Sequence, residues 1–133
     1  MSAPIGTILV IDDEDTVHSL VRYHLERAGF SVVSAKDTPS ALRSIDEAPE
    51  LLAVLLDIHL PRPDIGWALL ARLVKLKETK LAKTSIIVYS VNDDKRRARA
   101  AGADEHFVKP VNHKDLITLL ENYAEQRSKA EDQ

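Results

Sequence analysis

The sequence contains no cysteine, which excludes disulfide bonds, thiolate chemistry and zinc sites built on sulfur. It also lacks a large excess of either charge, because the formal net charge is only -3. Such a balance disfavours direct binding to nucleic acids or membranes. No apolar run approaches the roughly 20 residues that cross a bilayer, and the N-terminus "MSAPIGT" has no signal-peptide pattern. We therefore expect a cytoplasmic protein that contacts neither nucleic acid nor membrane directly.

Length and composition indicate one ordinary domain. The chain has 133 residues, of which 44% are hydrophobic and 29% are charged. A chain of this size buries roughly two-thirds of the surface that it exposes when unfolded, which is enough for a continuous core. The composition is that of a globular protein rather than of a disordered one.

Short apolar runs alternate with helical patterns along the chain. Between the first two runs, Val17, Val21 and Leu25 repeat at helical spacing. Most of the runs are continuously apolar, as expected for strands that are buried on both faces. The alternation predicts an α/β fold of three layers, with a parallel sheet between two layers of helices. The predicted strands are residues 7–11, 31–34, 51–56, 85–89 and 106–108.

Polar side chains follow four of the predicted strands: Asp12 and Asp13, then Asp57, Ser90 and Lys109. Because parallel strands end at one edge of a sheet, we expect these side chains to converge there. Clustered carboxylates repel one another unless a cation lies among them, and oxygen ligands favour a hard divalent ion such as Mg²⁺. In that setting Asp57 can accept a phosphoryl group as an acyl phosphate, with Ser90 and Lys109 directed at the phosphoryl oxygens.

Each of these residues also has an ordinary explanation. Acidic side chains stabilise the N-terminus of a helix, which would account for Asp12 and Asp13. Asp57 can be a turn residue before Pro61, and a Lys-Pro pair is common in loops. Their joint placement at the ends of successive strands favours a functional site over these separate explanations.

The chain resembles the receiver domains of two-component response regulators. The resemblance is carried by "ILVIDDE", "LLDIHLP", "IIVYS" and "AGADEHFVKP" and by the spacing between them. It covers about residues 5–126, which leaves short tails at 1–4 and 127–133. The fold that the resemblance implies is flavodoxin-like, with a five-stranded parallel sheet in the order 2-1-3-4-5.

The resemblance also implies a function, namely a phosphorylation-dependent signalling switch. Asp57 would receive a phosphoryl group from a histidine kinase or a histidine phosphotransfer protein. Mg²⁺ would be held by Asp13, Asp57 and the backbone carbonyl of His59, with Asp12 acting mainly through a bound water. The bond between Lys109 and Pro110 would be cis. The protein would transmit its state to a downstream effector by contact, as a monomer or weak dimer, and would catalyse only its own phosphorylation and dephosphorylation.

The chain departs from the family pattern at two positions and in one segment. Val91 replaces a very small residue after the strand-four hydroxyl, which predicts slow loss of the phosphoryl group. His106 stands where many members have a switching Tyr or Phe. Its imidazole either rotates as a pH-sensitive switch or is a half-exposed edge residue. The predicted helix over 93–101 has only alanines to bury and should be marginal. Its outward side chains, which either are solvated or meet an acidic partner, are Arg96, Arg97 and Arg99.

Three other classes of protein share parts of this pattern. A phosphatase with an aspartyl nucleophile needs a second Asp two residues after the first, where this chain has His59. A flavodoxin needs a phosphate cradle after the first strand, where "DDEDT" would repel a phosphate. A receiver-like scaffold without phosphoryl turnover is the remaining alternative. The complete acidic set argues against it, whereas Val91 and His106 keep it open.

Overall fold

The computed structural model describes residues 3–48 and 50–131. Residues 1, 2, 132 and 133 of the two predicted tails lie outside the described part. The strands are β1 (Thr7–Ile11), β2 (Ser31–Ala35), β3 (Ala53–Asp57), β4 (Ser85–Ser90) and β5 (Glu105–Val108). The helices are α1 (Asp15–Arg27), α2 (Thr38–Glu47), α3 (Pro63–Leu76), α4 (Lys95–Ala100) and α5 (His113–Glu131).

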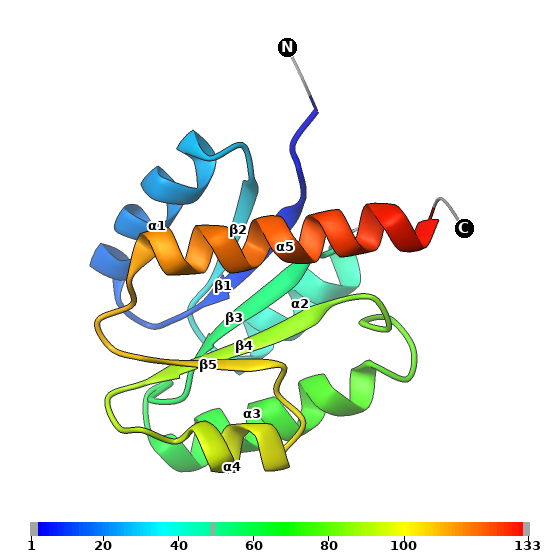
Figure 1. Ribbon diagram of the computed structural model, residues 1–133. Coiled ribbons are helices and arrows are strands. Elements are labelled where there is room, and N and C mark those ends of the chain that lie inside the picture. The colour runs from blue at the N-terminus through cyan, green and yellow to red at the C-terminus, as the bar shows by residue number, and fades with distance from the viewer. Residues whose placement is uncertain (1–2, 49, 132–133) are drawn as a thin grey trace.

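All strand pairings are parallel, and the order in the sheet is β2-β1-β3-β4-β5. Helices α1 and α5 cover one face, and α2, α3 and α4 cover the other (Figure 1). This is the flavodoxin-like three-layer arrangement that the sequence predicts. In the described part of the chain, no helix is both long and apolar enough to cross a membrane.

The central strands are apolar throughout because each face of the sheet packs against its own helices. In β1, Leu9 and Ile11 join the core under α2 and α3, whereas Ile8 and Val10 join the core under α1 and α5. Successive side chains of a strand point to opposite faces, so a strand covered on both sides needs apolar residues at every position. The rigid centre of the sheet then fixes whatever follows the ends of β1, β3 and β4.

Local signals explain where several helices begin. Asp37 caps α2 by accepting from the Ser40 amide at 2.9 Å, and Asn112 accepts from the Asp115 amide at 3.1 Å at the start of α5. Helix α3 begins three residues before Gly66 and lies very close to the strand exit. A Cβ built on Gly66 would be 1.8 Å from the carbonyl oxygen of Ile58, so only glycine permits this approach.

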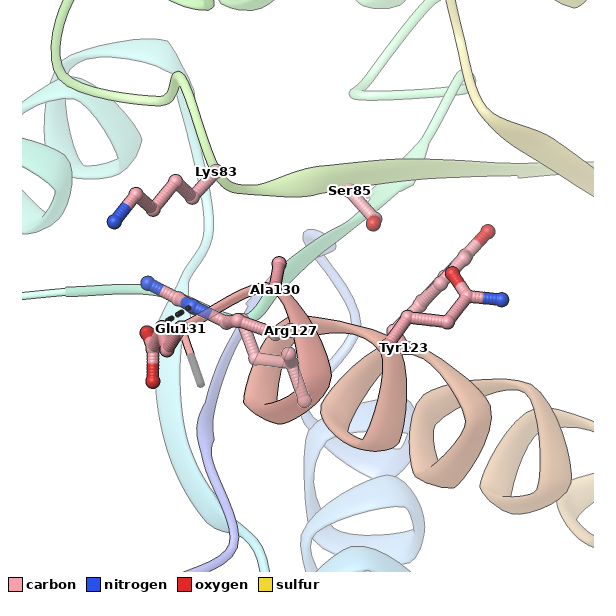
Figure 2. A pocket seen from close by; sticks show the side chains of 8 residues that line it. Lys83, Ser85, Tyr123, Arg127, Ala130 and Glu131 are labelled. Carbon is pink, nitrogen blue, oxygen red and sulfur yellow. Dashed lines mark ion pairs between the residues drawn. The ribbon is translucent and has the colours of Figure 1, made fainter. Parts of the chain in front are cut away.

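The C-terminal helix is longer than predicted. It continues to Glu131, although the sequence analysis ended the domain at 126. Arg127 donates to the Leu51 carbonyl at 3.2 Å and pairs with Glu131 at 3.7 Å. Figure 2 shows these two residues beside a pocket of about 360 Å³ that Lys83 also lines. The contact with Leu51 forms only when the sheet has folded, which is why the polar residues at this end of the helix do not reveal it.

Candidate functional site

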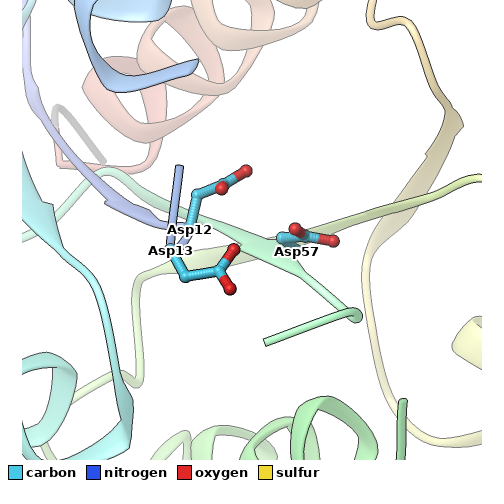
Figure 3. Close-up of side chains that lie close together, drawn as sticks. All are labelled: Asp12, Asp13 and Asp57. Atoms are coloured by element: carbon cyan, nitrogen blue, oxygen red, sulfur yellow. The ribbon is translucent and has the colours of Figure 1, made fainter. Parts of the chain in front are cut away.

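Three carboxylates lie together at the carboxyl edge of the sheet. Asp12 and Asp13 follow β1, and Asp57 is the last residue of β3. One ligand atom from each lies within 4.8 Å of the others, and Figure 3 shows the side chains next to one another. Such proximity is unfavourable for three negative charges unless positive charge compensates them. The predicted convergence of these residues is therefore present in the structure.

Asp12 is fully buried and held by two donors. Its Oδ1 accepts from the backbone N–H of Glu14 at 2.8 Å, and its Oδ2 accepts from the hydroxyl of Tyr89. Burial raises the pKa of Asp12 above its usual value, while the hydrogen bonds from Tyr89 and Glu14 oppose that rise. Asp13, by contrast, is exposed. The cluster thus combines one anchored carboxylate with one that solvent reaches.

Asp57 is only 1% exposed, yet its two oxygens differ. Oδ1 accepts from the backbone N–H of His59 at 2.9 Å and from the ammonium of Lys109 at 2.9 Å. Among the described residues, nothing donates a hydrogen bond to Oδ2. The charge of Asp57 is therefore balanced from one side, and the other oxygen can act as a nucleophile.

Lys109 is placed by its neighbours on two strands. Its backbone N–H donates to the Ser90 carbonyl at 2.8 Å, and its peptide bond to Pro110 is cis. Its Nζ lies 5.1 Å from the centroid of the Tyr89 ring, within the range of a cation–π contact. The ammonium is therefore close both to Asp57 and to an aromatic face.

The Ser90 hydroxyl lies at the centre of a small polar network. Its Oγ is 2.8 Å from Nε2 of His106, 2.9 Å from the carboxylate of Asp94 and 2.9 Å from the carbonyl of Asn92. One hydroxyl has a single proton. Because a carboxylate and a carbonyl only accept, the arrangement is satisfied when Nε2 of His106 donates to Ser90 and Ser90 donates to Asp94 or Asn92. Asp94 therefore links the hydroxyl to the start of α4.

His106 is buried, with 7% of its surface exposed, so it is not the half-exposed edge residue that was one of the two expectations. Burial lowers the pKa of His106, while the charges of Asp94 and Asp93 oppose this shift. The sequence could not choose between the two expectations, because β5 is an edge strand and its pattern fits either orientation. The structure places the ring on the side of Ser90.

The arginines of α4 lie away from the acidic cluster. Arg96, Arg97 and Arg99 are exposed. The guanidinium of Arg97 lies 4.1 Å from the centroid of the Trp67 ring, and Arg99 pairs with Glu105 at 3.3 Å. Helix α4 runs over only Lys95–Ala100 and has Ala98 as its one buried residue, as expected for a marginal helix.

Val91 follows β4 and Tyr89 lies near its end, and the structure adds to what the sequence indicates about both residues. Val91 is 57% exposed and lines a groove with Val17, Leu20, Lys109 and other residues, and slow loss of the phosphoryl group stays a prediction. Tyr89 was missed altogether. In "SIIVYS" it reads as one more core residue, because the sequence does not show that its hydroxyl reaches Asp12 across the sheet.

The chemistry of the cluster suits a hard divalent cation. The available side-chain donors are all carboxylate oxygens, which Mg²⁺ prefers. Lys109 already contributes one positive charge, but a single ammonium does not balance three carboxylates. His59 contributes its backbone to the same loop, and its Nδ1 lies 4.0 Å from Oδ1 of Asp57. The residues present therefore fit the ion that the sequence analysis expects.

Comparison with known proteins agrees with this geometry. The family described as "Response regulator receiver domain" matches residues 8–121. The chain belongs to that family. It is thus a receiver domain of the kind found in two-component systems, and the resemblance noted from its motifs is confirmed.

Two curated relatives show how this receiver domain occurs in longer and shorter proteins. An uncharacterized 14.6 kDa protein from Leptolyngbya boryana is 32% identical over 118 residues, which are 87% of this chain and 88% of the relative. The alkaline phosphatase synthesis transcriptional regulatory protein PhoP of Bacillus subtilis is 32% identical over 112 residues, which are 82% of this chain but 44% of PhoP. The chain thus spans nearly all of one relative and less than half of the other.

Solved structures show the same fold. A CheY-like receiver domain protein from Methanospirillum hungatei JF-1 has a TM-score of 0.79 and 26% identity, with 94% of this chain and 98% of that one covered. A response regulator from Burkholderia pseudomallei has a TM-score of 0.74 and 26% identity, with 95% and 72% covered. The latter structure is described as containing a phosphorylated aspartic acid, a calcium ion and citrate.

Proposed function

We propose that this receiver domain is a signalling switch that accepts a phosphoryl group on Asp57 from a histidine kinase or a histidine phosphotransfer protein. The observation that carries the proposal is the asymmetry of the Asp57 carboxylate. Oδ1 is held by His59 and Lys109, whereas Oδ2 receives no hydrogen bond from the described residues. A buried carboxylate fixed by one oxygen presents the other in a constant orientation.

The transfer itself exchanges one bond for another. Oδ2 of Asp57 attacks phosphorus, a P–O bond forms, and the P–N bond to the donor histidine breaks. The imidazole of the donor leaves with the bonding electrons and takes up a proton. The ammonium of Lys109 is close enough to stabilise the negative charge first on the carboxylate and then on the new phosphoryl oxygens. The Ser90 hydroxyl can donate a hydrogen bond to one of these oxygens.

Mg²⁺ is the cofactor that we propose for this site. Asp13, Asp57 and the backbone carbonyl of His59 would hold it, and Asp12 would act mainly through a bound water. When bound, the ion would supply positive charge against the carboxylates and the phosphoryl oxygens. The supporting observations are the cluster of Asp12, Asp13 and Asp57 and its oxygen-only donors. The phosphorylated aspartic acid and calcium ion described in the Burkholderia protein support the same pairing of groups here.

The structural change that follows phosphorylation of Asp57 would begin at the Ser90 hydroxyl. Its single proton now serves Asp94 and Asn92. A phosphoryl oxygen on Asp57 would compete for that proton, while Nε2 of His106 could continue to donate to the same Oγ. Asp94 would then lose its donor. Because Asp94 immediately precedes α4 and its side chain makes no capping hydrogen bond there, its release would alter the start of that helix.

The wider role follows from the domain's limited chemistry. We propose that it catalyses only its own phosphorylation and dephosphorylation, that it acts in the cytoplasm, and that an effector protein reads its state by contact. The exposed arginines of α4 are part of the surface that would change. PhoP is named as a transcriptional regulatory protein, but this chain covers less than half of it, and for the receiver domain itself we propose no direct contact with nucleic acid.

The test is phosphorylation with a small donor. Wild type, Asp57→Ala and the surface variant Asp46→Ala are incubated with acetyl phosphate and Mg²⁺, and the intact mass is followed. We expect one phosphoryl group on wild type and on Asp46→Ala, and none on Asp57→Ala. Phosphorylation that survives in Asp57→Ala would remove Asp57 from its role. A wild-type protein that stays unmodified by both acetyl phosphate and a panel of phosphorylated histidine kinases would favour the scaffold alternative.

A further inference from the structure

Tyr89 is a buried residue that touches both charged sides of the site. It is 2% exposed and lies in β4, where it is in register with Asp57. Its side chain belongs to the core under α1 and α5, so it reaches the acidic cluster from that face of the sheet. A hydroxyl there requires a partner, and the partner is Asp12.

The hydroxyl of Tyr89 fixes the second oxygen of Asp12. Oδ1 of Asp12 is held by the Glu14 amide, and Oδ2 accepts from Tyr89. The two donors together leave the carboxylate plane little freedom to rotate. A tyrosine hydroxyl ordinarily has a pKa of about 10, so it is a donor at physiological pH.

The ring of Tyr89 faces the ammonium of Lys109. The 5.1 Å between Nζ and the ring centroid and the 2.9 Å between Nζ and Oδ1 of Asp57 place the ammonium against both groups. The face of an aromatic ring attracts a cation. The ring therefore limits where the ammonium can lie when the charge on Asp57 changes.

We propose that Tyr89 is a positioning residue with two separable parts: its hydroxyl orients Asp12 toward the metal site, and its ring holds Lys109 over the phosphoryl acceptor. This inference rests on the function proposed above. Asp12 would act mainly through a water on the ion, and loss of a group that orients such outer partners of a metal typically weakens binding by tenfold or more. The hydroxyl should therefore govern Mg²⁺ affinity, whereas the ring should govern the rate of transfer once Mg²⁺ is bound.

The first experiment removes only the hydroxyl. Tyr89→Phe keeps the ring, so we expect Mg²⁺ to bind about tenfold more weakly in isothermal titration calorimetry. The rate of phosphorylation by acetyl phosphate at saturating Mg²⁺ should stay within about twofold of wild type, because Lys109 retains its aromatic neighbour. Tyr123→Phe is the matched control, since it removes a hydroxyl from α5 beside the pocket of Figure 2. It should change neither quantity.

The second experiment removes the ring as well. Tyr89→Leu should bind Mg²⁺ about as weakly as Tyr89→Phe, but its rate at saturating Mg²⁺ should fall a further threefold or so because the ammonium loses its aromatic contact. A role in packing alone would not divide the effects in this way. Thermal unfolding of each variant checks that the fold is retained. If Tyr89→Leu does not fold, Tyr89→Phe still decides the part played by the hydroxyl, and Tyr89→Met, which lacks the ring but has a flexible apolar side chain that adapts to core gaps, decides the part played by the ring.

The outcomes distinguish this inference from the proposed function. Unchanged Mg²⁺ affinity in Tyr89→Phe, or tighter binding, would overturn the assignment of the hydroxyl. Equal rates for the Phe and Leu variants would overturn the assignment of the ring. Either result can occur while wild type is phosphorylated normally on Asp57. A wild-type protein that neither binds Mg²⁺ nor accepts a phosphoryl group would instead overturn the proposed function, and this inference with it.

Discussion

At the ends of β1 and β3, Asp12 and Asp57 are each fixed by a main-chain N–H two residues further along the chain. At the end of β4, by contrast, the Ser90 hydroxyl accepts from His106, while the carboxylate of Asp94 and the loop carbonyl of Asn92 compete for its one proton. We call the first region the anchored half of the site and the second the exchangeable half. A nucleophile benefits from a constant position, whereas a switch needs an element with two arrangements of similar energy.

The helix next to the anchored half is packed more tightly than the helix next to the exchangeable half. The anchored half has α3 pressed against the exit of β3, with Gly66 in close contact with Ile58. The exchangeable half leads into α4, which has six residues and a single buried one, Ala98. A short helix with little buried surface opens at small cost in free energy. The difference indicates that phosphorylation would move α4 and leave the acidic cluster in place.

The largest effect should come from breaking the anchored half at Gly66. In Gly66→Ala the new Cβ meets the Ile58 carbonyl oxygen at 1.8 Å, so α3 and the loop after Asp57 must separate. We expect the free energy of unfolding to fall by about 3 kcal/mol, at the upper end for overpacking. Urea unfolding measures this fall. Phosphorylation by acetyl phosphate should also become slower, because the loop carries His59.

A glycine–alanine exchange at another position of α3 shows what such a change ordinarily does to the stability of a helix. Replacing glycine by alanine within a helix normally raises stability by roughly 1 kcal/mol. Ala71→Gly on the exposed side of α3 should therefore cost about that amount and leave phosphorylation unchanged. If Gly66→Ala proved as stable as wild type, the close approach would not be what holds the anchored half.

An intermediate effect is expected from His106 in the exchangeable half. Burial places the pKa of His106 below its ordinary value of 6.5, although Asp94, Asp93 and Glu105 oppose this and Lys95 adds to it. The unfolded chain then takes up the proton first as the pH falls. The contribution of the neutral ring is fully present above pH 6.5 and is lost as the pH drops from there toward the folded pKa.

Comparing wild type with His106→Phe at each pH isolates this ring from the other histidines. We expect the stability difference between the two proteins, measured by thermal unfolding, to favour wild type most at pH 7.5 and to shrink below pH 6.5. A difference that stays constant from pH 7.5 to pH 5 would mean that His106 does not titrate differently in the folded state. The exchangeable half would then have no pH dependence from this ring.

The sequence predicts the anchored half much better than the exchangeable half. Apolar strands with a carboxylate at the end are local patterns, and parallel topology brings such ends together, so Asp12, Asp13 and Asp57 could be placed without coordinates. The orientation of His106 could not, because one edge-strand residue fits either an inward or an outward ring. Tyr89 escaped notice for a related reason: its residue type fits the core, and only the registers of β4 against β3 and of β3 against β1 bring its hydroxyl to Asp12.

The two ends of α5 show the same difference: a local sequence signal sets one end, and a contact with a residue distant in sequence sets the other. Asn112 is a local capping signal, and α5 begins directly after it. The far end of α5 depends on Arg127 reaching Leu51, which is distant in sequence. No pattern within the last turn of the chain encodes that contact. Residues whose partners lie on another element therefore mark the limit of prediction here, both in the fold and in the site.

The smallest effect should distinguish two neighbouring arginines of α4. Arg97 lies 4.1 Å from the Trp67 ring of α3, whereas Arg96 is exposed and makes no ion pair or ring contact within the described residues. Arg97→Ala should lower the free energy of unfolding by about 0.5 kcal/mol, as for a surface cation–π contact, and change the fluorescence of Trp67. Arg96→Ala should do neither. If the two variants behave alike, the Arg97–Trp67 contact does not help to hold α4 against α3, and the exchangeable half is looser than this contact indicates.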